Sequence, residues 1–307
     1  MTRRRAVAAG SLLAVAAAVA AWAVAYPQAA LTPTVVRTVA DCAAVLCLGL
    51  AVLPILDDPR HRGEVLSRAT APLTAAAALW VLAELARLIV AAAQTAAVPL
   101  PALGLRTTVE FATATAPGRA GLISVAVAAA VAAVLPALRR SASTNVVVAG
   151  LAVVGVVTRQ LTGHFADDAV GGLAVTMHTL AAALWCGALA AMVLTVEHRG
   201  QWARMLPRFS RLSLWCVAVL LLGGLVGAAV RMSAFAELWT SGYGRVLGAK
   251  IAMTVVLVVL GWRNRTMWLP AARTHRTSVD VSAARSRGET ALMTVALALA
   301  AGLAVTG

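Results

Sequence analysis

The sequence predicts an all-α polytopic membrane helical bundle with about nine transmembrane helices, on the basis of its composition, its apolar runs and its arginine distribution. Of the 307 residues, 61% are hydrophobic and only 12% are charged, whereas a soluble globular chain averages roughly 25% charged residues. The mean hydropathy is +0.86. Apolar runs of about 20 residues recur along the chain, and each is long enough to cross a hydrocarbon core of about 30 Å. No soluble domain of appreciable size is expected.

Apolar segments long enough to span a membrane follow one another from the N-terminus onward. The first follows Arg3-Arg4-Arg5. At about 20 residues it is too long for the apolar region of a cleaved signal peptide, so we expect a retained helix. We divide the chain into N-terminal membrane helices over 1–143 and a second membrane domain over 144–307. The predicted spans are 6–25, 34–56, 70–93, 119–138, 144–162, 171–196, 212–231, 245–262 and 290–306.

The arginines give the predicted orientation. Arginine supplies all but one of the 26 basic residues, and the net charge is +14. The basic residues concentrate in alternate loops, as the positive-inside rule predicts for cytoplasmic loops. This pattern indicates that the positive charge serves insertion in the lipid bilayer and not the binding of nucleic acid. We therefore expect a multi-pass protein of the cytoplasmic membrane with a cytoplasmic N-terminus. The basic loops are 1–5, 57–69, 139–143, 197–211 and 263–289.

Two connecting segments are longer than the others. The outer segment 94–118 contains several prolines and is expected to lie on the membrane surface as a short interfacial helix. The inner segment 263–289 is polar and basic, and it is expected to be the most mobile part of the chain.

Motifs in the first half of the chain match motifs in the second half in the same order. They predict a parallel internal repeat of four helices, with the first span as an extra element. An even number of spans separates the partners, so the two copies share one orientation. In alanine-rich helices such matches also arise by chance. The matched motifs are His61-Arg62-Gly63 with His198-Arg199-Gly200, Ala43 to Leu46 and Gly49 with Ala181 to Leu184 and Gly187, and Thr115 to Arg119 with Ser241 to Arg245.

Several charged or reactive side chains fall inside the apolar segments. Arg37 with Asp41, at i,i+4, and Glu84 with Arg87, at i,i+3, are expected to form ion pairs on their own helices. The one lysine, Lys250, is expected to extend toward the outer surface or to pair with an acid such as Asp41. The cysteines lack CxxC spacing, so buried free thiols are favoured over a disulfide framework or a zinc site, with copper ligation as the alternative. They are Cys42, Cys47, Cys186 and Cys216.

Two of the five histidines lie in or against apolar segments. His178 lies about seven residues inside its span, or roughly 10 Å deep at 1.5 Å per residue. His164 ends the preceding span, so the two imidazoles can meet near the outer surface. An ionisable group inside a membrane helix is costly and is therefore a functional hypothesis by default. Neutral imidazole is the commonest side chain for binding transition metals.

Two further side chains are candidate ligands. Met177 offers a thioether, which suits Cu(I). Asp41 aligns with Thr179 if the repeat is real, and its carboxylate can then reach a shared polar cavity. A structural role stays open for each: a membrane histidine can bond a backbone carbonyl on another helix, and methionine usually packs in a core. The sequence thus predicts a candidate metal site of His164, His178, Met177 and Asp41.

One ordered set of motifs resembles a known family. It comprises Gly163-His164, the run from His178 to Gly187, Arg208-Phe209-Ser210-Arg211, Tyr243-Gly244-Arg245 with Leu247 and Lys250, Asn264-Arg265, and Glu289. In order and spacing this set resembles the copper resistance protein D (CopD) family of bacterial inner-membrane proteins, over about residues 160–307. Two positions depart from the family pattern: Ala188 stands where a second glycine is usual, and Asp167-Asp168 stands where small residues are usual.

The resemblance implies that the protein imports copper across the cytoplasmic membrane or delivers it there, with His164 and His178 at the family's histidine positions. The implied partners are the copper ion and a periplasmic or extracellular copper chaperone. Two alternatives stay open. One is a haem-binding electron carrier, since histidines that face each other between helices hold haem. The other is a non-catalytic factor that helps to metallate an oxidase. No nucleophile–base pair, phosphate loop or HExxH motif is found, so an enzyme is not expected.

Overall fold

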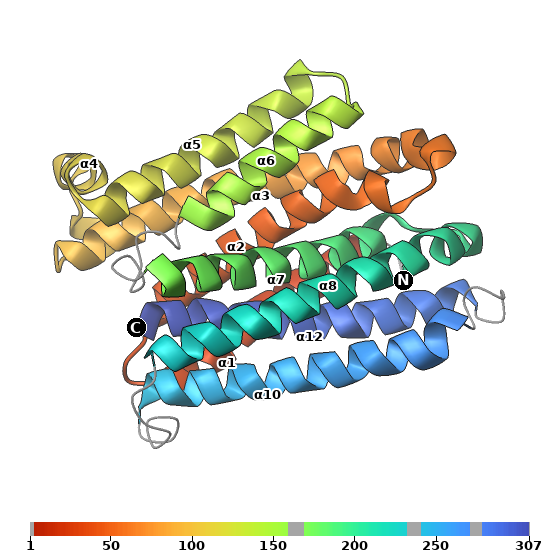
Figure 1. The fold of residues 1–307 in the computed structure, drawn as a ribbon. Coiled ribbons are helices and arrows are strands. Elements are labelled where there is room, and N and C mark those ends of the chain that lie inside the picture. The colour runs from red at the N-terminus through yellow and green to blue at the C-terminus, as the bar shows by residue number, and fades with distance from the viewer. Residues whose placement is uncertain (1–2, 159–168, 232–240, 271–277, 307) are drawn as a thin grey trace.

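Long α-helices make up most of the chain in this computed structural model, which describes residues 3–158, 169–231, 241–270 and 278–306 and has no strand among them. Eight of the described helices are long and apolar enough to cross a membrane, and a shorter apolar helix is described over Ala142–Thr158. The predicted all-α polytopic bundle is confirmed, and each predicted span corresponds to one of these helices (Figure 1).

The helices follow one another through short connections. Those that correspond to the predicted spans are α1 (Arg3–Ala25), α2 (Leu31–Val52), α3 (Arg62–Thr95), α5 (Ala116–Ala137), α6 (Ala142–Thr158), α7 (Ala169–Thr195), α8 (Arg199–Arg231), α10 (Gly242–Arg263) and α12 (Val279–Thr306). The shorter elements are η1 (Leu53–Leu56), η2 (Pro59–His61), η3 (Leu100–Ala102), α4 (Leu105–Ala114) and the π-helical turn η4 (Asn264–Trp268). The helix α4 is the short helix expected within the outer segment 94–118.

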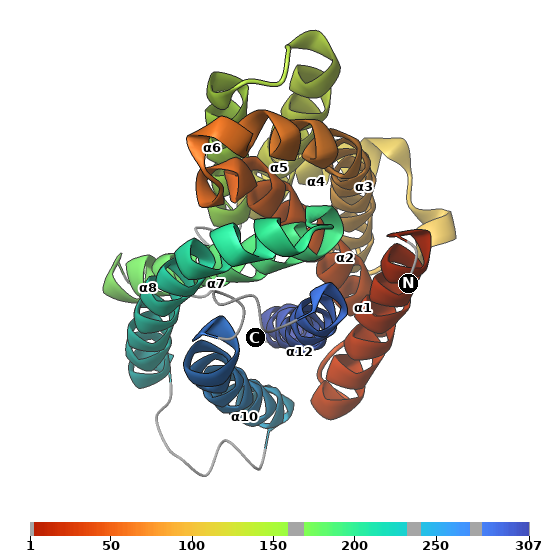
Figure 2. The same cartoon turned by 90° about the vertical axis from the view of Figure 1, so that its right-hand side faces the viewer.

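The helices α2 and α7 lie at the centre of the bundle. The helix α2 packs against α1, α3, α6, α7 and α12, and α7 packs against α2, α8 and α12. Figures 1 and 2 show α3, α4, α5 and α6 on one side of this central pair and α1, α10 and α12 on the other. Buried side chains of the central helices and their neighbours, among them Trp80, Leu189 and Met192, form the main hydrophobic core.

Two glycines allow α2 and α7 to cross closely. A Cβ atom placed on Gly49 would overlap the carbonyl group of Gly187, and one placed on Gly187 would overlap the carbonyl of Val45. Small residues at such crossings let helix backbones approach each other, and van der Waals packing then holds membrane helices together. The pair Gly49–Gly187 therefore fixes how the two central helices meet.

The same crossing supports the predicted repeat, because Gly49 and Gly187 are matched positions of the two copies. Thr115 and Ser241 are also matched, and each hydroxyl accepts a hydrogen bond of 2.9 Å from the backbone N–H three residues ahead, at the start of α5 or α10. The packing of α2 on α3 has its counterpart in α7 on α8, and that of α5 on α6 in α10 on α12. The predicted repeat pairs α2, α3, α5 and α6 with α7, α8, α10 and α12 and leaves α1 outside it, but the packing of α3 on α5 has no comparable counterpart between the described residues of α8 and α10.

Several helices extend beyond the apolar runs that predict them. The helix α8 begins at Arg199, α10 continues into η4, and α12 begins at Val279. The segment 197–211, expected to be a loop, is therefore mostly helical. The prediction of a loop over 263–289 is also wrong, because most of its described residues are helical. Hydropathy reports the thickness of the hydrocarbon layer, whereas a helix continues as long as its polar turns find partners at the membrane surface.

Ion pairs join the two halves of the chain at one end of the bundle. Arg204 of α8 donates hydrogen bonds of 2.9 and 3.2 Å to the carboxylate of Asp57, which is fully buried between η1 and η2. Arg68 of α3 pairs with Glu197 at 2.9 Å and with Glu64 at 3.0 Å. These residues belong to the predicted basic loops 57–69 and 197–211, so the two loops lie at the same end of the bundle. We call this the latched end.

Candidate metal site

His178 lies in the half of α7 that is farther from the latched end, and its side chain is half-buried against α8. Glycines of α8 make room for it. A Cβ atom placed on Gly223 would come within 3.1 Å of the His178 Cβ, and one placed on Gly224 would come within 3.1 Å of the His178 Nδ1. Gly223 and Gly227, spaced four residues apart, thus give α8 a close-packing face against α7.

A hydrogen bond fixes the orientation of this imidazole ring. Nδ1 of His178 lies 2.7 Å from the carbonyl oxygen of Leu220 on α8. Because a carbonyl oxygen only accepts, Nδ1 carries the proton, and Nε2 of the neutral ring keeps its lone pair. Metal-binding histidines are commonly oriented in this way, with one ring N–H donated to a carbonyl and the other nitrogen bound to the metal. The contact thus serves a structural role and leaves Nε2 able to act as a ligand.

Lys250 of α10 lies within electrostatic range of His178. Its predicted pairing with Asp41 is not formed, because the Asp41 carboxylate pairs with Arg37 and Arg87 instead. A positive charge close to the imidazole opposes the arrival of a cation there. A metal ion at His178 would therefore meet a positive charge that lies on another helix.

Asp41 belongs to a network of four charges between α2 and α3. Its carboxylate lies 3.4 Å from Nη1 of Arg87 and 3.7 Å from Nε of Arg37. Arg87 also lies 3.6 Å from Glu84, whose carboxylate accepts a hydrogen bond from Trp80 at 3.3 Å. Both predicted local pairs, Arg37–Asp41 and Glu84–Arg87, are confirmed, and the Arg87–Asp41 contact joins them. Two positive and two negative charges balance, and both oxygens of Asp41 face arginines.

The other predicted ligands do not gather around His178 in the described part of the chain. Met177 is next to it in sequence, and 40% of its surface is exposed. His164 lies outside the described residues. No contact between Asp41 and His178 is found, and the described ranges contain no group of three or more histidine, cysteine, aspartate or glutamate side chains arranged to hold a metal ion. Of the predicted site, the structure therefore presents His178 as a single oriented ligand.

A second group of polar side chains lies toward the latched end, where α8, α10 and α12 meet. Asn264 donates a hydrogen bond of 2.8 Å to the carboxylate of Glu289, and Arg265 donates one of 2.9 Å to the hydroxyl of Ser210. Both donors lie on η4, and π-helical turns are frequent at functional sites. Glu289 is only 3% exposed. These four residues line a cavity of about 30 Å³, close to the volume of one water molecule.

The sequence alone predicts no role for this second group, although its residues belong to recognisable motifs. Asn264-Arg265 and Glu289 carry part of the family resemblance, and Glu289 is a carboxylate at the very start of an apolar run. Its contact with Asn264 depends on how α10 packs against α12, which spacing along the chain does not give.

Four thiols also lie in the described helices. Cys186 of α7 lies within electrostatic range of Cys42 on α2, Cys216 on α8 and Glu289 on α12. All the cysteines are free, as the sequence predicts; Cys47, Cys186 and Cys216 are buried, whereas Cys42 is half-buried.

The fold and this histidine define the class of protein: a many-spanning helical membrane protein whose interior presents a potential metal ligand. Residues 27–175 match the model of the N-terminal domain of copper resistance protein D-like proteins, and residues 203–303 match the model of copper resistance protein D. Together the matches cover most of the chain, and the chain belongs to the copper resistance protein D family. The recognition from sequence motifs is confirmed. Neither a curated protein nor a solved structure gives a significant match.

Proposed function

We propose that the protein takes up copper ions from outside the cell and imports or delivers them at the cytoplasmic membrane, with His178 as a capture ligand. The hydrogen bond of 2.7 Å from Nδ1 to the Leu220 carbonyl carries this proposal, because it orients the ring and leaves Nε2 free. Membership of a copper resistance family indicates the metal. His164 and Met177 are the companion ligands in the proposal. Asp41 can join them only by leaving its arginines.

The proposed orientation follows from the arginine-rich loops. The positive-inside rule assigns the latched end, with Arg68 and Arg204, to the cytoplasm. The half of α7 that contains His178 then faces the outer surface, and the N-terminus lies in the cytoplasm. A copper ion that arrives from outside, alone or on a chaperone, meets this histidine first.

A route inward follows the interior face of α7. Beyond His178 an ion would meet the thiols of Cys186 and Cys216, and then the carboxylate of Glu289 beside Asn264. Thiolates select Cu(I), and imidazole also suits copper. Cys186 follows His178 on α7 and so lies nearer the latched end, which supports this order. In this proposal Glu289 is the last protein ligand before the cytoplasm.

The test compares copper binding by the purified full-length protein with binding by His178→Ala and by a double variant that also carries His164→Ala. We expect the wild type to hold about one copper ion against a competing chelator, His178→Ala to hold it at least about tenfold more weakly, and the double variant to hold none. His61→Ala, at the latched end, is the matched control and should bind as the wild type does.

Copper binding and cellular copper content that are unchanged in His178→Ala would reject the proposal. A Soret band in the absorption spectrum of the purified protein would favour a haem protein instead. Co-purification with an oxidase subunit, without any copper flux in vesicles, would favour an assembly factor.

A further inference from the structure

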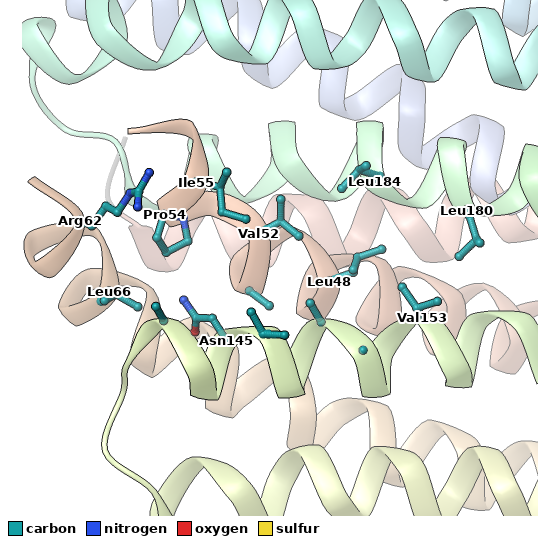
Figure 3. A pocket seen from close by; sticks show the side chains of 15 residues that line it. Leu48, Val52, Pro54, Ile55, Arg62, Leu66, Asn145, Val153, Leu180 and Leu184 are labelled. Atoms are coloured by element: carbon teal, nitrogen blue, oxygen red, sulfur yellow. The ribbon is translucent and has the colours of Figure 1, made fainter. Parts of the chain in front are cut away.

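An apolar groove of about 640 Å³ lies between α2, α6 and α7, and it reaches η1 and the start of α3. Figure 3 shows Leu48, Val52 and Leu184 along its length. Two of its lining residues, Ile55 and Val146, are 62% and 69% exposed, so the groove opens on the outer surface of the bundle. That surface faces hydrocarbon in a membrane. The groove is therefore reached from the lipid phase and not from the copper route inside the bundle.

One end of the groove is polar. Arg62 and Asn145 lie toward one end, and Leu180 and Val153 lie toward the other (Figure 3). Arg62 opens α3 next to the latched end, and it has no ion-pair partner in the described structure. An unpaired guanidinium at the membrane surface, above an apolar channel, is complementary to an anionic group that carries a hydrocarbon chain.

Two further polar groups near this end lack partners. Asn145 is only 6% exposed, and its side-chain oxygen has no hydrogen-bond partner among the described residues. Arg140 stands two residues before Ala142, another lining residue, and none of its three side-chain nitrogens has a partner there either. Burial lowers the pKa of Arg140. A buried polar group without a partner costs free energy, so a ligand that supplies a donor and an anion would stabilise this end.

We propose that the groove binds a phospholipid of the cytoplasmic leaflet with an anionic headgroup. One acyl chain lies between α2, α6 and α7, the phosphate pairs with Arg62, and a headgroup hydroxyl donates to the oxygen of Asn145. The depth order agrees with the orientation given above: the polar end lies at the latched end, where the headgroups of the inner leaflet are. This inference uses that orientation but does not depend on copper.

The structure favours a lipid over a transmembrane helix of another chain as the occupant. A helix is about 10 Å across with its side chains and meets broad faces, whereas this groove runs along the helix axes and ends at the guanidinium of Arg62 and the amide of Asn145. A freely diffusing phosphate would contact Arg62 alone and leave the apolar length empty. A phospholipid fills both parts.

The test uses native mass spectrometry of the full-length protein released from nanodiscs that contain phosphatidylglycerol and phosphatidylcholine in equal amounts. We expect the wild type to retain phosphatidylglycerol preferentially. Arg62→Ala should lower that preference by about fivefold, the effect of one basic residue at a charged membrane surface. Arg60→Ala, in the same connection but outside the groove, should retain the preference.

A second variant fills the groove itself. Gly150 lines the groove, and a Cβ atom placed on it meets no other atom within 4 Å, so Gly150→Leu adds volume without a backbone clash. It should lose the retained lipid, whereas Gly248→Leu on α10, equally free of contacts, should keep it. If the wild type retained the two lipids equally, or if Arg62→Ala kept the full preference of the wild type for phosphatidylglycerol, the proposal would be overturned. A change of oligomeric mass in Gly150→Leu would overturn it in favour of a second copy in the groove.

Discussion

The Leu220 carbonyl on α8 determines which ring nitrogen of His178 is available to a metal ion. This carbonyl holds the proton on Nδ1, so Nε2 would be the coordinating atom in the proposed copper site. This arrangement pre-organises the ligand, because the ring does not have to find its orientation when the ion arrives. Gly224 contributes to the same arrangement, since a larger side chain there would meet the ring, and Gly223 lets α8 approach the backbone of α7 beside His178.

At the same scale, Lys250 is expected to weaken copper binding at His178. Removing its charge with Lys250→Met should raise the copper affinity by up to about tenfold, which corresponds to about 1.4 kcal/mol of relieved repulsion. Chelator competition on the purified protein measures this. Lys250→Arg keeps the charge and is the control, with an affinity close to that of the wild type. An affinity in Lys250→Met equal to that of Lys250→Arg would show that the charge does not act on the site.

At the scale of helices, the Gly49–Gly187 crossing carries the contact between the two copies of the repeat. Gly49→Ala should lower the stability of the protein by about 1–3 kcal/mol, because a methyl group cannot fit between the two backbones without moving one of them. Thermal unfolding in detergent measures the change. Gly10→Ala in α1, where a Cβ meets nothing within 4 Å, should be neutral or slightly stabilising. Equal melting temperatures for the two variants would contradict a tight crossing.

The π-helical turn η4 shows how local geometry serves the second polar group. It directs Asn264 toward Glu289 on α12 and Arg265 toward Ser210 on α8. The widened turn thereby connects three helices at the inner end of the proposed copper route.

Hydropathy and arginine distribution were sufficient to predict the helices of the whole molecule, because a bilayer demands long apolar helices and an asymmetric charge. They could not predict that α8 begins at Arg199, since its first turns are polar. Arg204 pairs there with Asp57, between η1 and η2, and Gln201 donates a hydrogen bond to Glu64 of α3. The candidate site was predicted only in part. A histidine inside an apolar run identified His178, but its acceptor is a main-chain carbonyl of another helix, which no side-chain pattern reveals.

The pair Asp57–Arg204 ties the two halves of the molecule together, and it predicts a dependence of stability on pH. Burial alone would raise the pKa of Asp57, but the hydrogen bonds from Arg204 and from the backbone of Asp58 lower it below its ordinary value of 3.8. Because the folded-state pKa lies below the unfolded one, the carboxylate stabilises the fold fully above about pH 4 and loses this effect as the pH falls further.

Asp57→Asn should therefore unfold at a lower temperature at pH 7, with a loss of about 2–4 kcal/mol for breaking a buried pair. Its stability should also fall less than that of the wild type between pH 5 and pH 3. Asp58→Asn, at a half-buried neighbour that has no ion-pair partner among the described residues, is the control. Parallel pH profiles for the wild type and Asp57→Asn would contradict the assignment.

The ion pairs of the latched end have a mechanical consequence for the molecule. Side chains from the two halves of the chain form ion pairs there. Among the residues that the structure describes, no ion pair of comparable geometry joins the two halves around His178. Because these ion pairs hold the two halves of the chain together at the latched end, rocking of one half against the other would separate the helices first near His178. The helices near Glu289 would separate last.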